Sequence, residues 1–229
     1  MLTIGIVACS TEGAALCYRT ISLEGAQIIG RHDHPEVALH SFSLAHYMKC
    51  VDADDWAGVA ELMLASAERC AKAGADFLIC PDNTIHQCFD LVEHRSPRPW
   101  LHIAREVAKE AKQRGYKRLA VLGTRYLMEG PVYREAFKAA GTDYRVPGAE
   151  QRQRINQIIF DELVNGQFLP RSLAYYVEVI RAMKDEGCDA VVLGCTEIPL
   201  LVTPESSPLP TLDSTRLLAR AAVLKAVEG

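Results

Sequence analysis

The 229-residue sequence has no long hydrophobic run and little excess charge of either sign. Its longest apolar runs, such as residues 119–122 and 190–193, are far too short to cross a bilayer. A formal net charge of −4 gives no electrostatic reason to expect binding to nucleic acid or to an acidic membrane. The N-terminus lacks a basic segment followed by a long apolar stretch, so we expect no signal peptide.

The sequence also lacks the CxxC spacing that is common in metal-binding and redox cysteines. Eight scattered cysteines in a chain of this length do not form the pattern of a disulfide framework. They are Cys9, Cys17, Cys50, Cys70, Cys80, Cys88, Cys188 and Cys195. We therefore expect reduced thiols and a cytoplasmic location.

What the sequence does contain is an alternation of short apolar runs with amphipathic segments, which is typical of an α/β protein with parallel sheets. The predicted strands are residues 3–9, 75–80, 118–124 and 188–195. The predicted helices are residues 52–74, 99–115, 129–141, 151–166, 171–187 and 213–228. The expected organisation is two doubly wound α/β domains, the first made of residues 1–98 and 210–229 and the second of residues 99–209.

Two pairs of segments repeat at nearly one spacing. Residues 74–84 align with 187–197 without a gap, at a shift of 187 − 74 = 113, and this alignment pairs Asp76 with Asp189. Residues 3–10 align with 118–125 at a shift of 118 − 3 = 115, which also places Tyr18 on Tyr133. Chance similarity between buried strands would explain the matching apolar residues. It would not explain the shared Gly-x-Asp before each strand or the polar residues that follow each strand. A duplicated α/β half is the better interpretation.

The alignment identifies the residue of the first half that corresponds to Cys195. Cys80 aligns with Leu193, inside the predicted strand, whereas Asp82 aligns with Cys195 at the strand's carboxyl end. Open α/β sheets bind their ligands at the carboxyl ends of their strands. Asp82 and Cys195 are therefore the two residues predicted to face a ligand.

These segments resemble the aspartate/glutamate racemase superfamily over essentially the whole chain. Residues 83–86 (NTIH) match the family's Asn-Thr-x-His, and residues 194–197 form its Gly-Cys-Thr-Glu. Gly-Thr at 123–124 and the closing segment 210–223 are similar as well. The resemblance implies two α/β domains related by a pseudo-twofold axis, an active site between them, and proton transfer without metal, pyridoxal phosphate or another cofactor.

The resemblance also assigns roles to residues. Family members move the α-proton with two residues on opposite faces of the substrate, normally two cysteines, and here the pair is Asp82 and Cys195. Cys80 is interpreted as a buried structural thiol. Hydrogen-bond donors around the substrate carboxylate must stabilise the carbanion. The predicted substrate-binding residues are Asn83, Thr84, Thr124, Thr196, Ser10 and Ser41, with Glu197 and His86 in supporting positions.

Two further groups of residues have competing interpretations. The segment 31–47 carries four histidines together with Asp33 and Glu36. Such a group invites a metal site, but no second cluster completes one, so we expect no metal. Arg152 and Arg154 could hold the side-chain carboxylate of an acidic substrate, or could lie on a solvated helix face.

The leading hypothesis is a cofactor-independent amino-acid racemase, with aspartate or glutamate as substrate by resemblance. A second hypothesis is an isomerase or decarboxylase of a small dicarboxylic acid that uses Cys195 alone, because arylmalonate decarboxylases and maleate isomerases also depart from the two-cysteine pattern. A third is a catalytically inactive protein that binds a small carboxylate. The expected partner is a small molecule rather than nucleic acid or a membrane, and a homodimer is possible.

Overall fold

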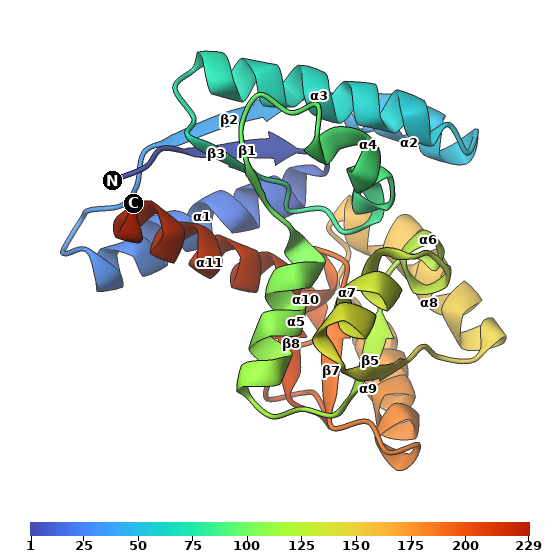
Figure 1. The fold of residues 1–229 in the computed structure, drawn as a ribbon. Helices are drawn as coiled ribbons and strands as arrows, with labels where there is room; N and C mark the ends of the chain where they lie inside the picture. The colour runs from blue at the N-terminus through green and yellow to red at the C-terminus, as the bar shows by residue number, and fades with distance from the viewer. The chain divides into compact units, whose positions relative to one another are not determined.

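The computed structural model describes residues 1–229, which divide into two α/β units (Figure 1). Unit 1 comprises Met1–Glu106 and Thr215–Gly229, and unit 2 comprises Val107–Ser214. Each unit contains one four-stranded, fully parallel sheet. Helix α5 (Ile103–Gln113) begins in unit 1 and ends in unit 2.

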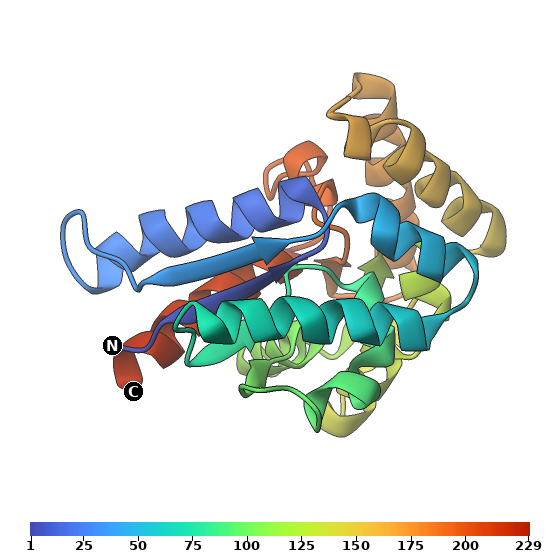
Figure 2. The ribbon, with the colours of Figure 1, turned by 90° about the horizontal axis from the view of Figure 1, so that it is seen from above.

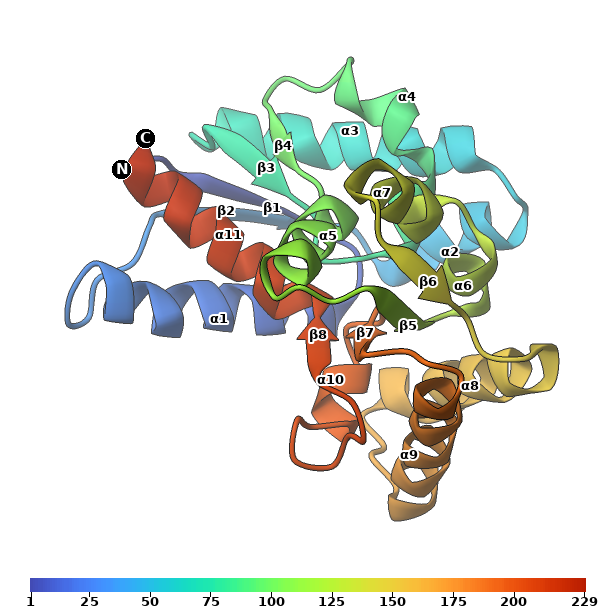
Figure 3. The ribbon, with the colours of Figure 1, turned by 60° about the horizontal axis from the view of Figure 1, so that its bottom comes forward.

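The sheet of unit 1 has the strand order β2-β1-β3-β4, which can be followed in Figure 3. Its strands are β1 (Ile4–Ala8), β2 (Val37–Ser41), β3 (Phe77–Ile79) and β4 (Trp100–Leu101). Helices α1 (Thr11–Ile28) and α11 (Ser214–Glu228) pack on one face, and α3 (Trp56–Lys72), preceded by α2 (Leu44–Asp52), packs on the other (Figures 1 and 2). The connection from β3 to β4 contains η1 (Thr84–Cys88) and α4 (Phe89–Glu93).

Strand β1 shows why this three-layer arrangement forms. Ile4, Ile6 and Ala8 alternate along the strand and join a core with the apolar face of α11. On the opposite face, a Cβ at Gly5 would lie 2.5 Å from Cδ2 of Leu78 and 3.1 Å from Cβ of Cys70 on α3. Only glycine permits this close approach of the helix to the sheet.

The sheet of unit 2 has the equivalent order β6-β5-β7-β8. Its strands are β5 (Arg118–Leu122), β6 (Asp143–Arg145), β7 (Ala190–Leu193) and β8 (Thr211–Asp213). Its helices are α6 (Arg125–Glu129), α7 (Val132–Ala140), α8 (Ala149–Asp161), α9 (Pro170–Asp185) and α10 (Ile198–Leu201), with η2 (Leu163–Asn165) after α8. Apolar side chains of α8 and α9 form one core with β5 and β7.

The strand registers agree with the predicted duplication. Ile4 pairs with Phe77 in unit 1, and Leu119 pairs with Ala190 in unit 2. The differences, 119 − 4 = 115 and 190 − 77 = 113, are the two shifts found in the sequence. Tyr18 and Tyr133, which the shift of 115 aligns, have different environments, because unit 2 has two short helices, α6 and α7, where unit 1 has α1. Tyr18 is 46% exposed on α1, whereas Tyr133 is buried.

The shared Gly-x-Asp has a structural role at the amino ends of the strands. The carboxylate of Asp76 accepts a hydrogen bond from the backbone N–H of Thr3 (2.8 Å). The carboxylate of Asp189 accepts bonds from the backbone N–H groups of Lys117 (2.6 Å) and Arg118 (3.2 Å). In each unit the aspartate therefore fastens the start of the neighbouring strand.

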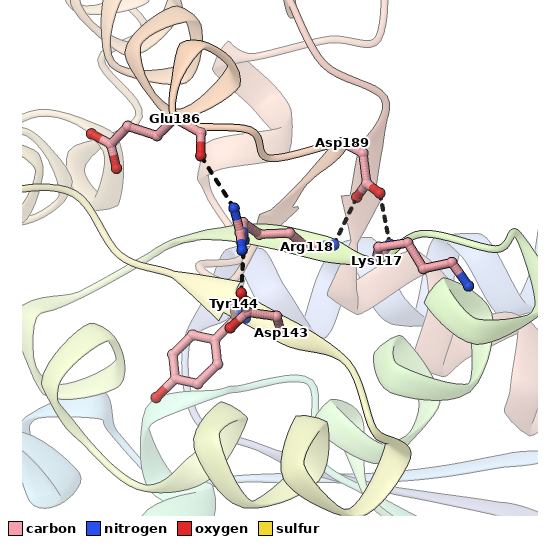
Figure 4. A network of polar contacts seen from close by, with 6 residues as sticks. All are labelled: Lys117, Arg118, Asp143, Tyr144, Glu186 and Asp189. Atoms are coloured by element: carbon pink, nitrogen blue, oxygen red, sulfur yellow. Dashed lines mark hydrogen bonds and ion pairs between the residues drawn. The ribbon is translucent and has the colours of Figure 1, made fainter.

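Unit 2 extends this fastening into a network, shown in Figure 4. The Arg118 guanidinium donates to the carboxylate of Asp143 on β6 (2.7 Å) and to the carbonyl of Glu186 at the end of α9 (3.5 Å). The network joins two strands and one helix at the end of the sheet opposite the carboxyl ends of the strands.

Several element boundaries differ from those predicted from sequence. The segment 52–74 is not one helix: α2 ends at Asp52, Asp54 has a positive φ of 54°, and Asp55 caps α3 by accepting from the N–H of Gly58 (2.8 Å). Residues 99–101 are not helical, because Trp100 and Leu101 pair with β3. The predicted helix 129–141 starts too early: α6 ends at Glu129, and α7 begins only at Val132, after Gly130 and Pro131.

Candidate active site

Polar side chains gather at the carboxyl ends of the parallel strands in each unit. In unit 1, Ser10 follows β1, Ser41 ends β2, and residues 82–84 follow β3. In unit 2, Thr124 follows β5 and residues 195–197 follow β7. Both segments lie at the carboxyl ends of strands, as predicted, and this edge of a parallel sheet is the usual location of ligand sites.

In unit 1, Asp82 is held at both its side chain and its backbone. One carboxylate oxygen, Oδ1, accepts a hydrogen bond from the backbone N–H of Ile85 (3.2 Å) at the start of η1. Its backbone carbonyl lies 2.6 Å from Nδ1 of His86. The half-buried Asp82 side chain thus leaves the strand in a defined direction.

Cys80 lies two residues earlier and has different surroundings. Its side chain is completely buried, and its Sγ lies 4.0 Å from the carbonyl oxygen of Asp82. Burial, reinforced by the charge of Asp82, raises the pKa of the Cys80 thiol well above its usual value. A thiol in these surroundings stays protonated near neutral pH and is a poor base or nucleophile.

The residues after Asp82 form a compact turn. Asn83 is buried and Thr84 is half-buried at the start of η1. The imidazole of His86 is buried against Phe89, with the rings stacked at 5.4 Å, and against His102, with ring centroids 4.5 Å apart. Burial lowers the pKa of His86 to about 4 and that of His102 to about 2, so both imidazoles are neutral at pH 7.

In unit 2, Cys195 forms a close pair with Glu197. The Cys195 thiol donates to Oε2 of Glu197 (3.0 Å), and the Thr196 hydroxyl donates to the same oxygen (2.8 Å). Glu197 is only 3% exposed, while Cys195 is 9% exposed. A carboxylate in this position can orient the thiol and accept its proton.

Two glycines bring the loops after β5 and β7 together. The backbone N–H of Gly194 donates to the carbonyl of Leu122 (2.7 Å). A Cβ at Gly194 would lie 3.0 Å from the carbonyl oxygen of Leu122, and one at Gly123 would lie 3.2 Å from the carbonyl oxygen of Gly194. These contacts explain the glycines that precede Thr124 and Cys195, because a larger residue would push the two loops apart.

The predicted hydroxyl residues have different environments. Thr124 caps α6, with its Oγ1 accepting from the N–H of Leu127 (3.2 Å), and Ser10 caps α1 in the same way through Gly13 (3.2 Å). Ser41 lies on the edge strand, is exposed, and donates to the carbonyl of Phe42 (3.0 Å). The cap positions place Thr124 and Ser10 at helix N-termini, where backbone amides favour anions.

Arg152 and His40 form polar contacts with neighbouring residues of their own unit. Arg152 pairs with Glu129 (3.1 Å) and donates to the carbonyl of Pro147 (2.8 Å). His40 contacts the hydroxyl of Ser66 on α3 (2.9 Å). The structure contains no group of three or more His, Cys, Asp or Glu side chains that could hold a metal ion. None of its helices is long and apolar enough to cross a membrane.

Three buried residues near the candidate positions were not predicted from sequence. His102 directly follows β4, and only the pairing of Leu101 with Ile79 reveals that it lies at the carboxyl end of a strand. The hydroxyls of Tyr47 in unit 1 and Tyr176 in unit 2 are buried without a hydrogen-bond partner. Burial raises the pKa of Tyr176, and the neighbouring Cys195 adds to this effect. No sequence motif marks these three residues, because each is distant in the chain from the candidate residues that it lies near.

The chain is similar to known racemases in sequence and structure. The family model described as Asp/Glu/Hydantoin racemase matches residues 6–222. The broad specificity amino-acid racemase RacX of Bacillus subtilis (strain 168) is 25% identical over 197 residues, which cover 83% of this chain and 82% of that protein. A crystal structure from Yersinia pestis, proposed to be an Asp/Glu racemase, has a TM-score of 0.90 at 30% identity, covering 99% of this chain and all (100%) of the other. An aspartate racemase homologue from Pyrococcus horikoshii OT3 has a TM-score of 0.84 at 27% identity, with 99% and 100% covered.

Proposed function

This chain belongs to the Asp/Glu/hydantoin racemase family, and from that premise we propose that it removes and returns the α-proton of a small amino acid without a cofactor. Aspartate and glutamate are the proposed substrates, because the family and the similar proteins carry those names. The observation that carries the proposal is the hydrogen bond between the Cys195 thiol and the buried Glu197 carboxylate (3.0 Å) at the carboxyl end of β7.

Cys195 is the proposed acid/base on one face of the substrate. Transfer of its proton to Glu197 leaves a thiolate, which then takes the proton from the substrate Cα. Thr196 donates to the same Glu197 oxygen and so keeps the carboxylate in place. A protonated Asp82 on the opposite face then gives its proton to the carbanion, which inverts Cα. In the reverse direction the Asp82 carboxylate takes the α-proton and the Cys195 thiol gives its own proton to the carbanion.

Asp82 is the proposed acid/base on the opposite face. Its carboxylate leaves the end of β3 in a direction set by the Ile85 amide and by its own anchored carbonyl. A carboxylate and a thiolate differ in intrinsic basicity, so the two directions of the reaction are unequal unless the closed site matches their pKa values. Cys80, fully buried directly after β3 rather than inside the strand as predicted, has no part in this proposal.

The substrate carboxylate must be bound so that charge can spread onto it in the transition state. The hydroxyls of Thr124 and Ser10 each accept a bond from a helix amide, and a hydroxyl in that role still has a hydrogen to donate. Together with Asn83, Thr84 and Thr196 they are the proposed carboxylate ligands. Ser41, exposed on the edge strand, is the outermost of the proposed substrate contacts.

The experiment is deuterium incorporation at Cα of D- and L-aspartate and D- and L-glutamate in D₂O, followed by NMR. We expect the Asp82→Asn variant to lose exchange from one enantiomer and to retain part of the exchange from the other, which Cys195 begins. We expect Cys195→Ala to abolish racemisation while its circular dichroism stays unchanged. Cys188→Ala removes a buried thiol from the amino end of the same strand and is the matched control. Racemisation that persists in Cys195→Ala would place the chemistry elsewhere.

A second function follows if Cys195 acts alone. The Cys195–Glu197 pair is complete within unit 2, and a single thiol serves for isomerisation or decarboxylation of a small dicarboxylic acid. Equal exchange rates in wild type and Asp82→Asn would favour this function. Binding of these acids without any exchange or turnover would instead favour an inactive binding protein.

Location and assembly complete the proposal. None of the eight cysteines forms a disulfide, which supports a reducing, cytoplasmic environment. A homodimer is the proposed assembly, and light scattering of the purified protein tests it.

A further inference from the structure

The contact between His86 and Asp82 assigns a specific role to a buried histidine that does not itself reach the reacting atoms. Nδ1 of His86 lies 2.6 Å from the backbone carbonyl oxygen of Asp82. A carbonyl oxygen only accepts hydrogen bonds, so Nδ1 carries the hydrogen and donates it. The imidazole is therefore the Nδ1–H tautomer when it is neutral.

The other ring nitrogen of His86 has no partner. Nε2 is buried without a hydrogen bond, in a side chain that is only 3% exposed. An unpaired buried polar atom is costly, and such an atom in a native protein calls for an explanation. A phenylalanine would fill the same space between Phe89 and His102 without that cost. The benefit of histidine at this position therefore comes from Nδ1.

What Nδ1 controls is the peptide plane between Asp82 and Asn83. Fixing that carbonyl fixes ψ of Asp82, while the Ile85 amide holds one carboxylate oxygen. The two bonds together determine where the Asp82 carboxylate points. A displacement of about 1 Å in a reacting group can slow a reaction about 100-fold, so the orientation of this carbonyl bears directly on proton transfer.

We propose that His86 is a positioning residue, whose Nδ1–H donates to the Asp82 carbonyl and thereby aims the Asp82 carboxylate at the substrate. The proposal rests on the proposed function for its kinetic part. Its structural part, the Nδ1–H tautomer, stands independently.

His102 provides a matched control within the same aromatic cluster. It is also a buried, neutral histidine, but its Nδ1 accepts from the backbone N–H of Ala104 (3.2 Å) at the start of α5. His102→Asn keeps an acceptor for that amide, since asparagine is a good residue at a helix start. Loss of packing in the cluster would affect both histidines alike, whereas loss of the Asp82 bond affects His86 alone.

The experiment compares His86→Phe, His86→Asn and His102→Asn in D₂O exchange from each enantiomer. In His86→Phe, which keeps an aromatic ring and removes the donor, exchange begun by Asp82 should fall about 10- to 100-fold. Exchange begun by Cys195 should change less than about threefold, because Glu197 and Thr196 are unaltered. His86→Asn, whose amide can donate from nearly the same place as Nδ1, should recover much of the loss. His102→Asn should leave the ratio of the two exchange rates unchanged.

Parallel loss of both exchange rates in His86→Phe, or an equal change of the ratio in His102→Asn, would overturn the positioning role. NMR of ¹⁵N-histidine-labelled protein supplies the readout that does not depend on activity. It should show His86 protonated at Nδ1 and bare at Nε2 near pH 7, and the Nε2–H tautomer would contradict the proposal. Absence of exchange in the wild-type enzyme with every amino acid tried would refute the proposed function, while the tautomer would still decide the hydrogen bond.

Discussion

Lowering the pH from 7.5 to 5 should destabilise unit 1 by an amount set by its two buried histidines. Burial lowers the folded-state pKa of His86 from 6.5 to about 4 and that of His102 from 6.5 to about 2. Because both values are depressed, the unfolded chain binds more protons than the folded one below pH 6.5. The free energy of unfolding is therefore highest above pH 6.5 and falls as the pH drops below it.

The size of this loss in the free energy of unfolding depends mainly on proton binding by the unfolded chain. At pH 5 both histidines are largely protonated in the unfolded chain and neutral in the folded one. Each then costs about 1.36 × 1.5, or about 2 kcal/mol, relative to neutral pH. Together they should lower the free energy of unfolding by about 4 kcal/mol, and His40, whose pKa is also lowered by burial, adds to the effect in the same direction.

The assay is urea denaturation followed by tryptophan fluorescence at several pH values between 5 and 7.5. Both tryptophans of the chain, Trp56 and Trp100, lie in unit 1, so fluorescence reports the unfolding of the unit that contains the histidines. His102→Asn should reduce the pH-dependent loss to about half. A free energy of unfolding that is the same at pH 5 and 7.5 would refute the reasoning, since it would mean that the histidines are not neutral and buried.

Three further variants test individual contacts. Gly194→Ala should lower stability by about 1–3 kcal/mol and reduce turnover, because its Cβ would lie 2.5 Å from Leu127 Cδ2 and 3.0 Å from the carbonyl oxygen of Leu122. A urea midpoint equal to that of the wild type would show that the loops accommodate the added methyl group. Asp189→Ala should cost about 1–3 kcal/mol by leaving the Lys117 and Arg118 amides without their carboxylate, with no change in KM; wild-type stability would mean that water replaces the carboxylate fully. Cys80→Ala should retain racemisation, and a loss as deep as that of Cys195→Ala would assign Cys80 a chemical role.

The duplication of the α/β half could be predicted from the sequence, because residues with the same structural role occur once in each unit. Asp76 and Asp189 both bind backbone amides of the adjacent strand, so they recur at a fixed distance from the ends of strands β3 and β7. The shift of 113 follows from this, whereas the shift of 115 comes from the equivalent strands β1 and β5. The same shift of 113 aligns Asp82, and not Cys80, with Cys195.

Other features could not be predicted, because they depend on contacts between distant segments. Strand β4 is only two residues long and is defined by its pairing with β3, so the sequence pattern alone predicts the start of a helix at residues 99–101. The Cys195–Glu197 bond joins residues two apart, yet nothing in the sequence shows that both side chains turn to the same side. The His86–His102 contact requires the chain to return from α4 to the sheet.

The most direct test of the central claim is the distance between the reactive atoms of Asp82 and Cys195 in a crystal structure with a bound substrate analogue. If one residue removes the α-proton and the other delivers its own proton to the opposite face, each reactive atom should lie about 3–3.5 Å from the substrate Cα. The Asp82 carboxylate oxygen and the Cys195 sulfur should then be about 6–8 Å apart, with the carbon between them. An Asp82 carboxylate that points away from the substrate, with Cys80 or another residue opposite Cys195, would contradict the account.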